Sequence, residues 1–166
     1  MKRLLPLLLI ALALPGCGLR PLYAGGGKGA VAQTLRDIEV APIGGKAGWL
    51  VRNALNDRLA AVDGAAPRYR LVIKLDDEIS GFGVRSDDAV TRERRTLRAR
   101  YQLVELGRDA VVLDATAGSD AGIDVTSSEY ATIAAENTAL ERLAQTVADQ
   151  IISRVALYAA RSPGGQ

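Results

Sequence analysis

The sequence predicts an α+β fold in which two helices pack on one face of a four-stranded, mostly antiparallel sheet, in the order β-α-β-β-β-α. Several stretches alternate apolar and polar residues, as strands with one buried face do. Two others carry apolar residues three and four positions apart, as amphipathic helices do. Of the 166 residues, 48% are hydrophobic and 24% are charged, which is the balance of one globular domain.

The first predicted elements are a strand, a helix and a second strand. Residues 35–43 alternate in polarity and predict a short strand, which a glycine pair breaks. Residues 46–62 have apolar side chains at helical spacing and predict a helix that a following glycine and proline end. Residues 69–79 place most of their apolar side chains on one face and predict a long strand, which Gly81 and Gly83 end or bulge.

Two further strands and a long helix follow. Residues 91–106 predict a second long strand. Its inner face is formed by Leu97, Ala99, Tyr101 and Leu103. A tight turn leads to a third long strand at residues 111–117, which completes an antiparallel meander. Residues 127–160 carry an apolar stripe and predict the last helix, with Thr126 and Glu129 in the pattern of a capping box.

The N-terminus has the pattern of a bacterial lipoprotein signal. Lys2 and Arg3 precede an apolar run over residues 4–14, which is too short to span a membrane and is typical of a secretory signal peptide. The run ends at residues 14–17, which read Leu-Pro-Gly-Cys and resemble a lipobox. In this pattern the signal is cut before Cys17, the cysteine sulfur receives a diacylglyceryl group and the new amino terminus is acylated. The alternative is an ordinary signal peptide with an unrelated cysteine.

The lipobox divides the chain into four predicted parts. These are a cleaved signal peptide (1–16), a lipidated N-terminus with a glycine-rich linker (17–33), a single α+β domain (34–160) and a flexible tail (161–166). Gly18 stands where an aspartate commonly retains a lipoprotein at the inner membrane, so we expect a lipid-anchored protein of the outer membrane. The signal carries both surplus positive charges of the chain, whose net charge is +2, so the mature chain is formally neutral.

The composition excludes most catalytic chemistry. The chain has no histidine and one cysteine, so it has no histidine-based triad, no internal disulfide and no four-cysteine zinc site. Aromatic residues make up only 4%, which argues against a stacking platform for nucleic acid. We therefore expect no catalytic residue, no metal site, no nucleic-acid partner and no cofactor besides the covalent diacylglyceryl and N-acyl lipid on Cys17.

Three other features have simple structural interpretations. Ser127 and Ser128 are interpreted as N-terminal residues of the last helix rather than as nucleophiles. The acidic residues 76–78 and 87–88 lack the spacing of a calcium-binding loop and are interpreted as strand or turn residues. Trp49, near the start of the first helix, is interpreted as an anchor in the core or on the domain surface.

A row of arginines on the second long strand is the main candidate for binding. Because residues i and i+2 share one face of a strand, four arginines are expected in line on its outer face. This arginine ladder consists of Arg92, Arg94, Arg98 and Arg100. Guanidinium groups suit bidentate binding of phosphate, so one hypothesis is that the ladder binds an anionic ligand such as phosphorylated lipid A. The alternative is a solvated face whose arginines pair with acids such as Asp76 or Glu78 on the neighbouring strand.

Three segments of the chain match a known family. Residues 17–23 read CGLRPLY, residues 52–59 of the first helix read RNALNDRL, and residues 128–158 of the last helix read SEYATIAAENTALERLAQTVADQIISRVALY. Together they resemble the LPS-assembly lipoprotein LptE family in its alphaproteobacterial form, over nearly the whole mature chain. The lipobox is common to many lipoproteins, and its combination with the last helix is much more specific.

The resemblance implies two helices against a four-stranded sheet, and it also implies a role. LptE is an outer-membrane lipoprotein and not an enzyme. It sits within the lumen of the β-barrel LptD, is needed for assembly of that barrel, and helps to insert lipopolysaccharide into the outer leaflet. The proposed lipopolysaccharide contact of the arginine ladder is inferred from the strand pattern and is not carried over from the family.

Two other functions stay open at this point. The main alternative is an auxiliary lipoprotein of an ABC-type lipid-transport system, which would also be a small α+β lipoprotein with a Cys-Gly-rich start. The other is a lipid-tethered periplasmic hydrolase. The absence of histidine, and of a carboxylate pair at useful spacing, argues against the hydrolase.

Overall fold

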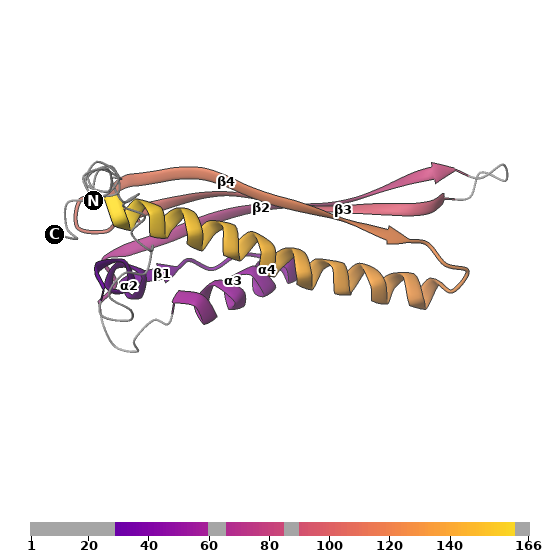
Figure 1. The fold of residues 1–166 in the computed structure, drawn as a ribbon, viewed down its shortest axis with the longest axis horizontal. Helices are drawn as coiled ribbons and strands as arrows, with labels where there is room; N and C mark the ends of the chain where they lie inside the picture. Colours follow the sequence, from indigo (N-terminus) through magenta and orange to yellow (C-terminus); the bar gives the residue numbers. More distant parts are fainter. Residues whose placement is uncertain (1–28, 60–65, 85–89, 162–166) are drawn as a thin grey trace, which may run out of the picture.

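The computed structural model describes residues 29–59, 66–84 and 90–161, and in these the helices lie on one side of a curved sheet (Figure 1). In chain order the elements are α2 (Ala30–Arg36), β1 (Ile38–Val40), α3 (Gly45–Leu59), β2 (Tyr69–Val84), β3 (Val90–Glu105), β4 (Ala110–Asp124) and α4 (Glu129–Arg161). This arrangement confirms the predicted α+β class and the predicted order of strands and long helices, to which it adds the short helix α2.

The four strands form one sheet in sequence order, β1-β2-β3-β4. The short strand β1 pairs in parallel with the start of β2, and α3 makes the crossover between them. The strands β2, β3 and β4 pair as antiparallel neighbours. Pairing of β2 with β3 runs from Tyr69 opposite Glu105 to Val84 opposite Val90, so these two strands form one long hairpin.

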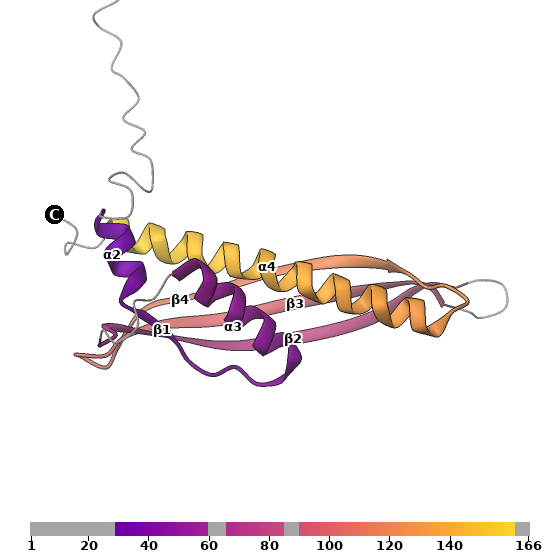
Figure 2. The same cartoon turned by 90° about the horizontal axis from the view of Figure 1, so that it is seen from below.

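The domain is elongated, and different elements form its two ends. The helix α2 and the end of α4 lie at one end, while the end of β2, the start of β3 and the start of α4 lie at the other (Figures 1 and 2). We call this second end, around residues 79–84, 90–93 and 129–133, the distal tip. At 1.5 Å per residue the 33 residues of α4 extend for about 50 Å.

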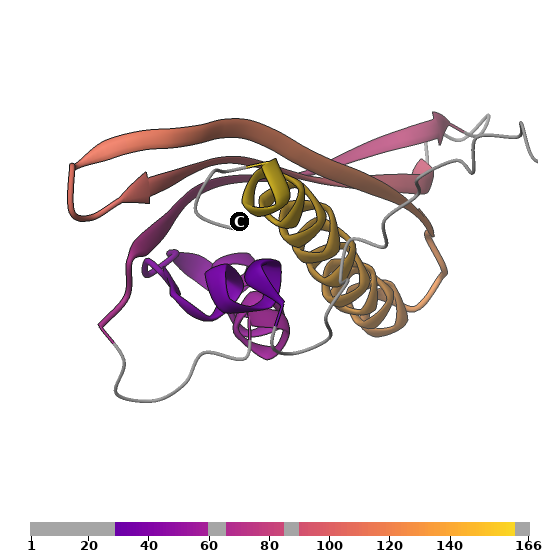
Figure 3. The same cartoon turned by 60° about the vertical axis from the view of Figure 1, so that its left-hand side comes forward.

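The core lies between one face of the sheet and the helices α3 and α4 (Figure 3). Successive strand residues point to opposite faces, so the odd-numbered apolar residues of β2 and β3 face the helices. Fully buried side chains come from both layers: Leu71, Leu97, Tyr101 and Leu103 from the sheet, Val51 and Leu55 from α3, and Leu140, Val147, Ile151 and Val155 from α4. The predicted inner face of β3 is therefore confirmed.

Two strands are longer than the sequence predicts. The strand β4 continues past Ala117 to Asp124, and β2 passes through Gly81 and Gly83 to Val84. The residues of β4 that pack against the core include three alanines: Ala115, Ala117 and Ala121. Small side chains allow close packing but alternate only weakly in hydrophobicity with their polar neighbours. The sequence pattern therefore ends this strand too early.

The helix boundaries differ from the prediction in two places. The helix α2 occupies Ala30–Arg36, where a linker and the first residues of a strand are expected, and it contacts α4. The helix α4 begins at Glu129, and its N-cap is Ser128, whose Oγ accepts a hydrogen bond from the Ala131 N–H at 3.4 Å. The predicted cap at Thr126 is therefore wrong, since its hydroxyl donates to the Ser128 carbonyl. The interpretation of Ser128 as a helix N-terminal residue is confirmed.

Some predictions fall on parts of the chain that lie outside the described residues. Residues 1–28, with the signal peptide and Cys17, are among these, as is the end of the tail at residues 162–166. The division into signal, linker, domain and tail therefore stays a prediction. Within the described ranges, no helix combines the length and the apolar composition needed to cross a membrane.

Gly48 is a position where the fold leaves no room for a side chain. It is buried on α3, and a Cβ there would lie 2.6 Å from the carbonyl oxygen of Ile43. We predict that Gly48→Ala lowers the free energy of unfolding by about 1–3 kcal/mol, although alanine has the higher helix propensity. The control Gly44→Ala, where nothing lies within 4 Å of the new Cβ, should change it by less than about 0.5 kcal/mol. Urea denaturation compares the two variants, and equal stability would contradict this packing.

Candidate functional site

No described helix or strand packs over the face of the sheet that points away from the helices, and we call it the outer face (Figures 1 and 3). Even-numbered residues of β2, of β3 and of β4 from Asp114 onward point to it, because their odd-numbered neighbours face the core. The structure places the four arginines of the ladder together on this face of β3, with all four exposed: Arg92, Arg94, Arg98 and Arg100. The ladder is therefore a real surface feature of the fold.

Three of the four ladder arginines pair with aspartates on β4. The ion pairs are Arg92 with Asp124 at 3.2 Å, Arg94 with Asp120 at 3.8 Å and Arg100 with Asp114 at 3.1 Å. Asp76 and Glu78 on β2, the partners expected from the sequence, form no ion pair within the described ranges. Because exposed pairs add little stability, these contacts mainly orient the side chains and neutralise their charge.

In the ion pair of Arg100 and Asp114, each side chain stabilises the charged form of the other. The Arg100 guanidinium, helped by the Gln102 amide at 2.8 Å, holds the pKa of the Asp114 carboxyl below its usual value. The hydrogen bond to Asp114 in turn raises the pKa of Arg100. Both groups therefore stay charged at physiological pH, and this part of the outer face does not titrate there.

Arg98 differs from its neighbours because it has no ion pair in the part of the chain that the structure describes. It lies opposite Asp76 on β2 and opposite Gly118 on β4. The missing side chain at Gly118 makes room for it, since a Cβ there would lie 3.3 Å from the Arg98 Cγ. Arg98 thus lies over the glycine, with its guanidinium available to a ligand.

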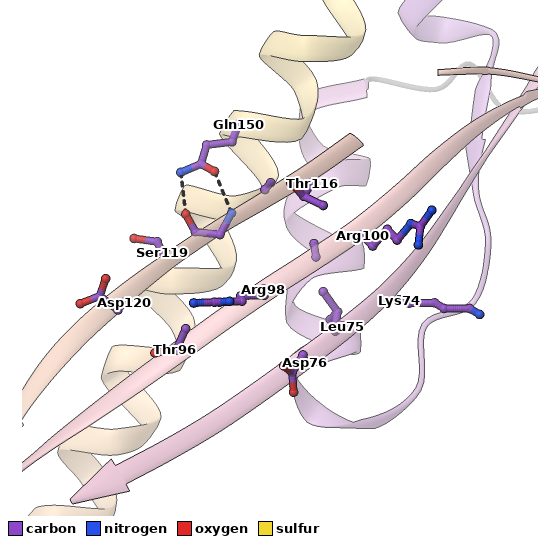
Figure 4. A pocket seen from close by; sticks show the side chains of 13 residues that line it. Lys74, Leu75, Asp76, Thr96, Arg98, Arg100, Thr116, Ser119, Asp120 and Gln150 are labelled. Atoms are coloured by element: carbon purple, nitrogen blue, oxygen red, sulfur yellow. Dashed lines mark hydrogen bonds between the residues drawn. The ribbon is translucent and has the colours of Figure 1, made fainter. Parts of the chain in front are cut away.

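The outer face is hollowed around Arg98, and we call this cavity of about 660 Å³ the outer hollow (Figure 4). The charged residues that line it are Lys74, Asp76, Arg98, Arg100 and Asp120. Arg100 and Asp120 are each paired with another residue of the outer face. Among the described residues, the hollow therefore presents two cations without an ion pair, Lys74 and Arg98, against one such carboxylate, that of Asp76.

Gln150 on α4 fixes one side of the outer hollow. Its side-chain Oε1 accepts a hydrogen bond from the Gly118 N–H at 3.0 Å, and its Nε2 donates to the Gly118 carbonyl at 3.2 Å (Figure 4). These are the two bonds that another strand would form with this open edge of β4. Gln150 on α4 therefore provides hydrogen-bond partners for the backbone N–H and C=O of Gly118 at this strand edge. It also holds the rim of the hollow in place.

Arg95 has a structural role that the sequence reasoning missed. It belongs to the helix-facing row of β3, and its side chain is only 12% exposed. It donates two hydrogen bonds to Asp77 on β2, at 2.8 and 2.6 Å, and one to the Glu136 carbonyl on α4 at 3.1 Å. The bonds to Asp77 raise the pKa of Arg95. The alternation of strand residues between the two faces of the sheet could have predicted this contact, because Arg95 and Asp77 both stand at inward-facing positions among apolar residues.

The other candidates from the sequence do not gather into a site. Asp77 faces the helices, whereas Asp76 and Glu78 point to the outer face, so the acidic run does not form one cluster. Residues 87–88 and Cys17 lie outside the described ranges. In the described ranges, no three histidine, cysteine or acidic side chains come close enough together to hold a metal ion.

Comparison with protein families decides what kind of protein this is. The LptE family, described as lipopolysaccharide-assembly, matches residues 35–155. The chain belongs to the LptE family. The family consists of lipopolysaccharide-assembly lipoproteins and not of enzymes, and the resemblance found in the sequence is confirmed.

Solved structures of bacterial lipoproteins share the fold of this LptE family member. A lipoprotein from Caulobacter crescentus CB15 is 26% identical with a TM-score of 0.68, and the match covers 84% of this chain and 99% of that chain. Rare lipoprotein B from Shewanella oneidensis is 12% identical with a TM-score of 0.58, covering 74% and 96%. A minor lipoprotein from Acinetobacter baumannii is 12% identical with a TM-score of 0.59, covering 74% and 92%. At 12% identity the likeness shows the fold alone. A search of curated proteins gives no match.

The two rows of β3 should respond differently to the loss of an arginine. Arg95→Ala removes three hydrogen bonds of a nearly buried cation and leaves Asp77 unpaired, so it should lower the free energy of unfolding by about 1.5–3 kcal/mol. Arg98→Ala removes an exposed side chain that forms no ion pair with the described residues, and it should change the free energy of unfolding by less than about 0.5 kcal/mol. Chemical denaturation of both variants measures the difference. A loss at Arg98 as large as that at Arg95 would show that Arg98 holds the fold and is not available to a ligand.

Proposed function

We propose that this chain is an outer-membrane lipoprotein that partners a β-barrel of the LptD type, as plug and assembly factor, in the insertion of lipopolysaccharide into the outer leaflet. The observation that carries the proposal is the LptE family match over residues 35–155. In this role the chain acts by binding and performs no catalytic step.

The surface of the domain suits a place inside a polar barrel. The lumen of a large outer-membrane barrel is polar, and the outer face presents mostly charged and paired side chains to its surroundings. The apolar band of such a barrel is about 25 Å tall. A domain whose helix α4 extends for about 50 Å is long enough to follow the barrel wall beyond this band.

Exposed apolar side chains at the distal tip support a protein partner. Phe82 on β2 and Tyr130 and Ile133 on α4 are 40%, 85% and 46% exposed. Large apolar side chains gathered at one end of a domain are typical of an interaction surface. In the proposed complex they contact the barrel.

A lipid on Cys17 would attach the domain by the end opposite to the distal tip. The described chain starts with α2, which lies at that end (Figures 1 and 2). Each buried CH₂ group of an acyl chain contributes about 0.8 kcal/mol, and stable attachment takes more than one chain. The diacylglyceryl and N-acyl groups expected at the lipobox meet this requirement. The tether would also raise the effective concentration of the domain near a barrel in the same membrane.

The outer hollow supports direct contact with lipopolysaccharide. Guanidinium and ammonium groups bind phosphate, and Lys74 and Arg98 offer both without an ion pair to any acid of the described residues. We place a lipid A phosphate at these two side chains. The paired members of the ladder, Arg92, Arg94 and Arg100, would contribute less because aspartates already compensate their charge.

Affinity purification of the tagged lipoprotein from solubilised outer membranes tests the proposed partner. We expect it to recover a large β-barrel. A variant with Phe82→Ser and Tyr130→Ser should recover less of the barrel, because the substitutions replace two exposed aromatic side chains of the distal tip with small polar ones. The matched control with Val111→Ser and Leu157→Ser removes two apolar side chains that are 52% and 38% exposed elsewhere, and should recover as much as the wild type. Recovery of inner-membrane transporter subunits in place of a barrel would support the ABC-type alternative and contradict the proposal.

Binding of purified lipopolysaccharide tests the role of the ladder. The double variant with Arg94→Ala and Arg98→Ala should bind about tenfold more weakly or worse, since a charge-assisted hydrogen bond contributes about 1.5–3 kcal/mol. The control with Arg36→Ala and Arg142→Ala removes the same charge from exposed sites on the helices and should bind like the wild type. Unchanged affinity of the Arg94 and Arg98 variant would end the assignment.

A further inference from the structure

A groove between α3 and α4 contains the only tryptophan of the chain, Trp49, whose side chain is 63% exposed. The groove encloses about 270 Å³ and lies where the two helices run side by side (Figure 2). We call it the helical groove. Its polar lining comes from both helices, with Asp57 and Arg58 from α3 and Glu141 and Gln145 from α4.

The lining of the helical groove is net negative, with two carboxylates and one guanidinium. Asp57 and Glu141 have no hydrogen bond or ion pair through their side chains within the described ranges. Arg58, the cation among the described lining residues, is engaged elsewhere: its Nε donates to Asp149 at 2.5 Å and its Nη1 donates to the Ala54 carbonyl at 2.8 Å. Asp149 thus balances the charge of Arg58. The pKa of Arg58 is raised mainly by its hydrogen bond to Asp149 and less by the nearby charge of Asp57. Neither Asp57 nor Glu141 is held by a hydrogen bond or ion pair of its own in the described part of the chain.

The ring of Trp49 is open to a cation. Arg68 lies over Tyr69 at 5.1 Å and Arg94 lies over Phe82 at 5.3 Å, but no arginine or lysine of the described chain lies over Trp49. Tryptophan is the strongest aromatic partner for a cation, and a guanidinium can stack on a ring while it donates hydrogen bonds to carboxylates. Exposed tryptophan is also enriched among the residues that dominate protein interfaces.

We propose that the helical groove is a docking site for an arginine-rich segment of a protein partner, in which one guanidinium stacks on Trp49 and others pair with Asp57 and Glu141. Charge complementarity identifies the occupant. An acidic segment would meet two like charges, and an apolar segment would desolvate both carboxylates without compensation. The inference rests on the proposed function only in taking the barrel as the protein that carries this segment.

The emission of the single tryptophan provides the test, because it reports on the groove directly. The full lipoprotein in detergent is titrated with a short acetylated and amidated arginine peptide, and with the same peptide carrying citrulline in place of arginine. The arginine peptide should change the Trp49 emission saturably, with a dissociation constant on the order of 1 mM, and increasing salt should weaken it. Citrulline keeps the shape of arginine without its charge, so the citrulline peptide should give no saturable change. Equal responses to the two peptides would overturn the proposal.

Substitution of the two carboxylates gives a second readout. Asp57→Asn with Glu141→Gln keeps the tryptophan reporter and should weaken the arginine peptide about fivefold to tenfold. The control with Asp109→Asn and Glu129→Gln removes two exposed carboxylates outside the groove and should bind like the wild type. Unchanged affinity of the Asp57 and Glu141 variant, with an unchanged circular dichroism spectrum, would also overturn the proposal. No barrel is present in this titration. If the arginine peptide does not bind, the proposed barrel partnership is therefore unaffected. If the affinity purification recovers no barrel, the titration still tests the helical groove.

Discussion

The apolar side of α4 packs across β3 and β4, and this contact determines which surfaces of the domain are covered. Val147, Ile151 and Val155 are completely buried in it. Because α3 and α4 lie on the same side of the sheet, no element of the described ranges covers its other side, which is polar. The same packing brings Gln150 to the edge of β4 and the Glu136 carbonyl to Arg95, so α4 both closes the sheet edge and fixes the border of the outer hollow.

The two open surfaces of the domain differ in charge. On the outer face, Lys74 and Arg98 have no ion-pair partner in the described chain, whereas in the helical groove Asp57 and Glu141 have none. With a formal net charge of only +2, the chain has little overall attraction for a charged partner, so local arrangement has to select its partners. A phosphorylated lipid and a cationic protein segment could then bind on different sides of one domain. This separation suits the proposed role, in which the domain assists a barrel that handles lipopolysaccharide.

The alternation of apolar and polar residues along the strands predicted much of the fold and part of the site. The alternation around Leu97 and Tyr101 placed the core on one face of β3, and the arginines on the other followed from it. The pairing of each arginine could not be predicted, because it depends on the register of β3 with β4, which sets Gly118 opposite Arg98. The helical groove depends on how α3 lies against α4, which no local pattern encodes. For this reason Trp49 fitted either the core or the surface until the structure showed it exposed.

In the proposed function, this lipoprotein works in lipopolysaccharide assembly together with an outer-membrane barrel. Depletion of the lipoprotein in its own bacterium tests this most directly, with surface lipopolysaccharide and the folded fraction of the barrel measured in the same cells. The proposed function predicts that both fall together, because the barrel loses its assembly factor and lipopolysaccharide loses its route to the outer leaflet. Normal surface lipopolysaccharide with a fully assembled barrel after depletion would contradict it.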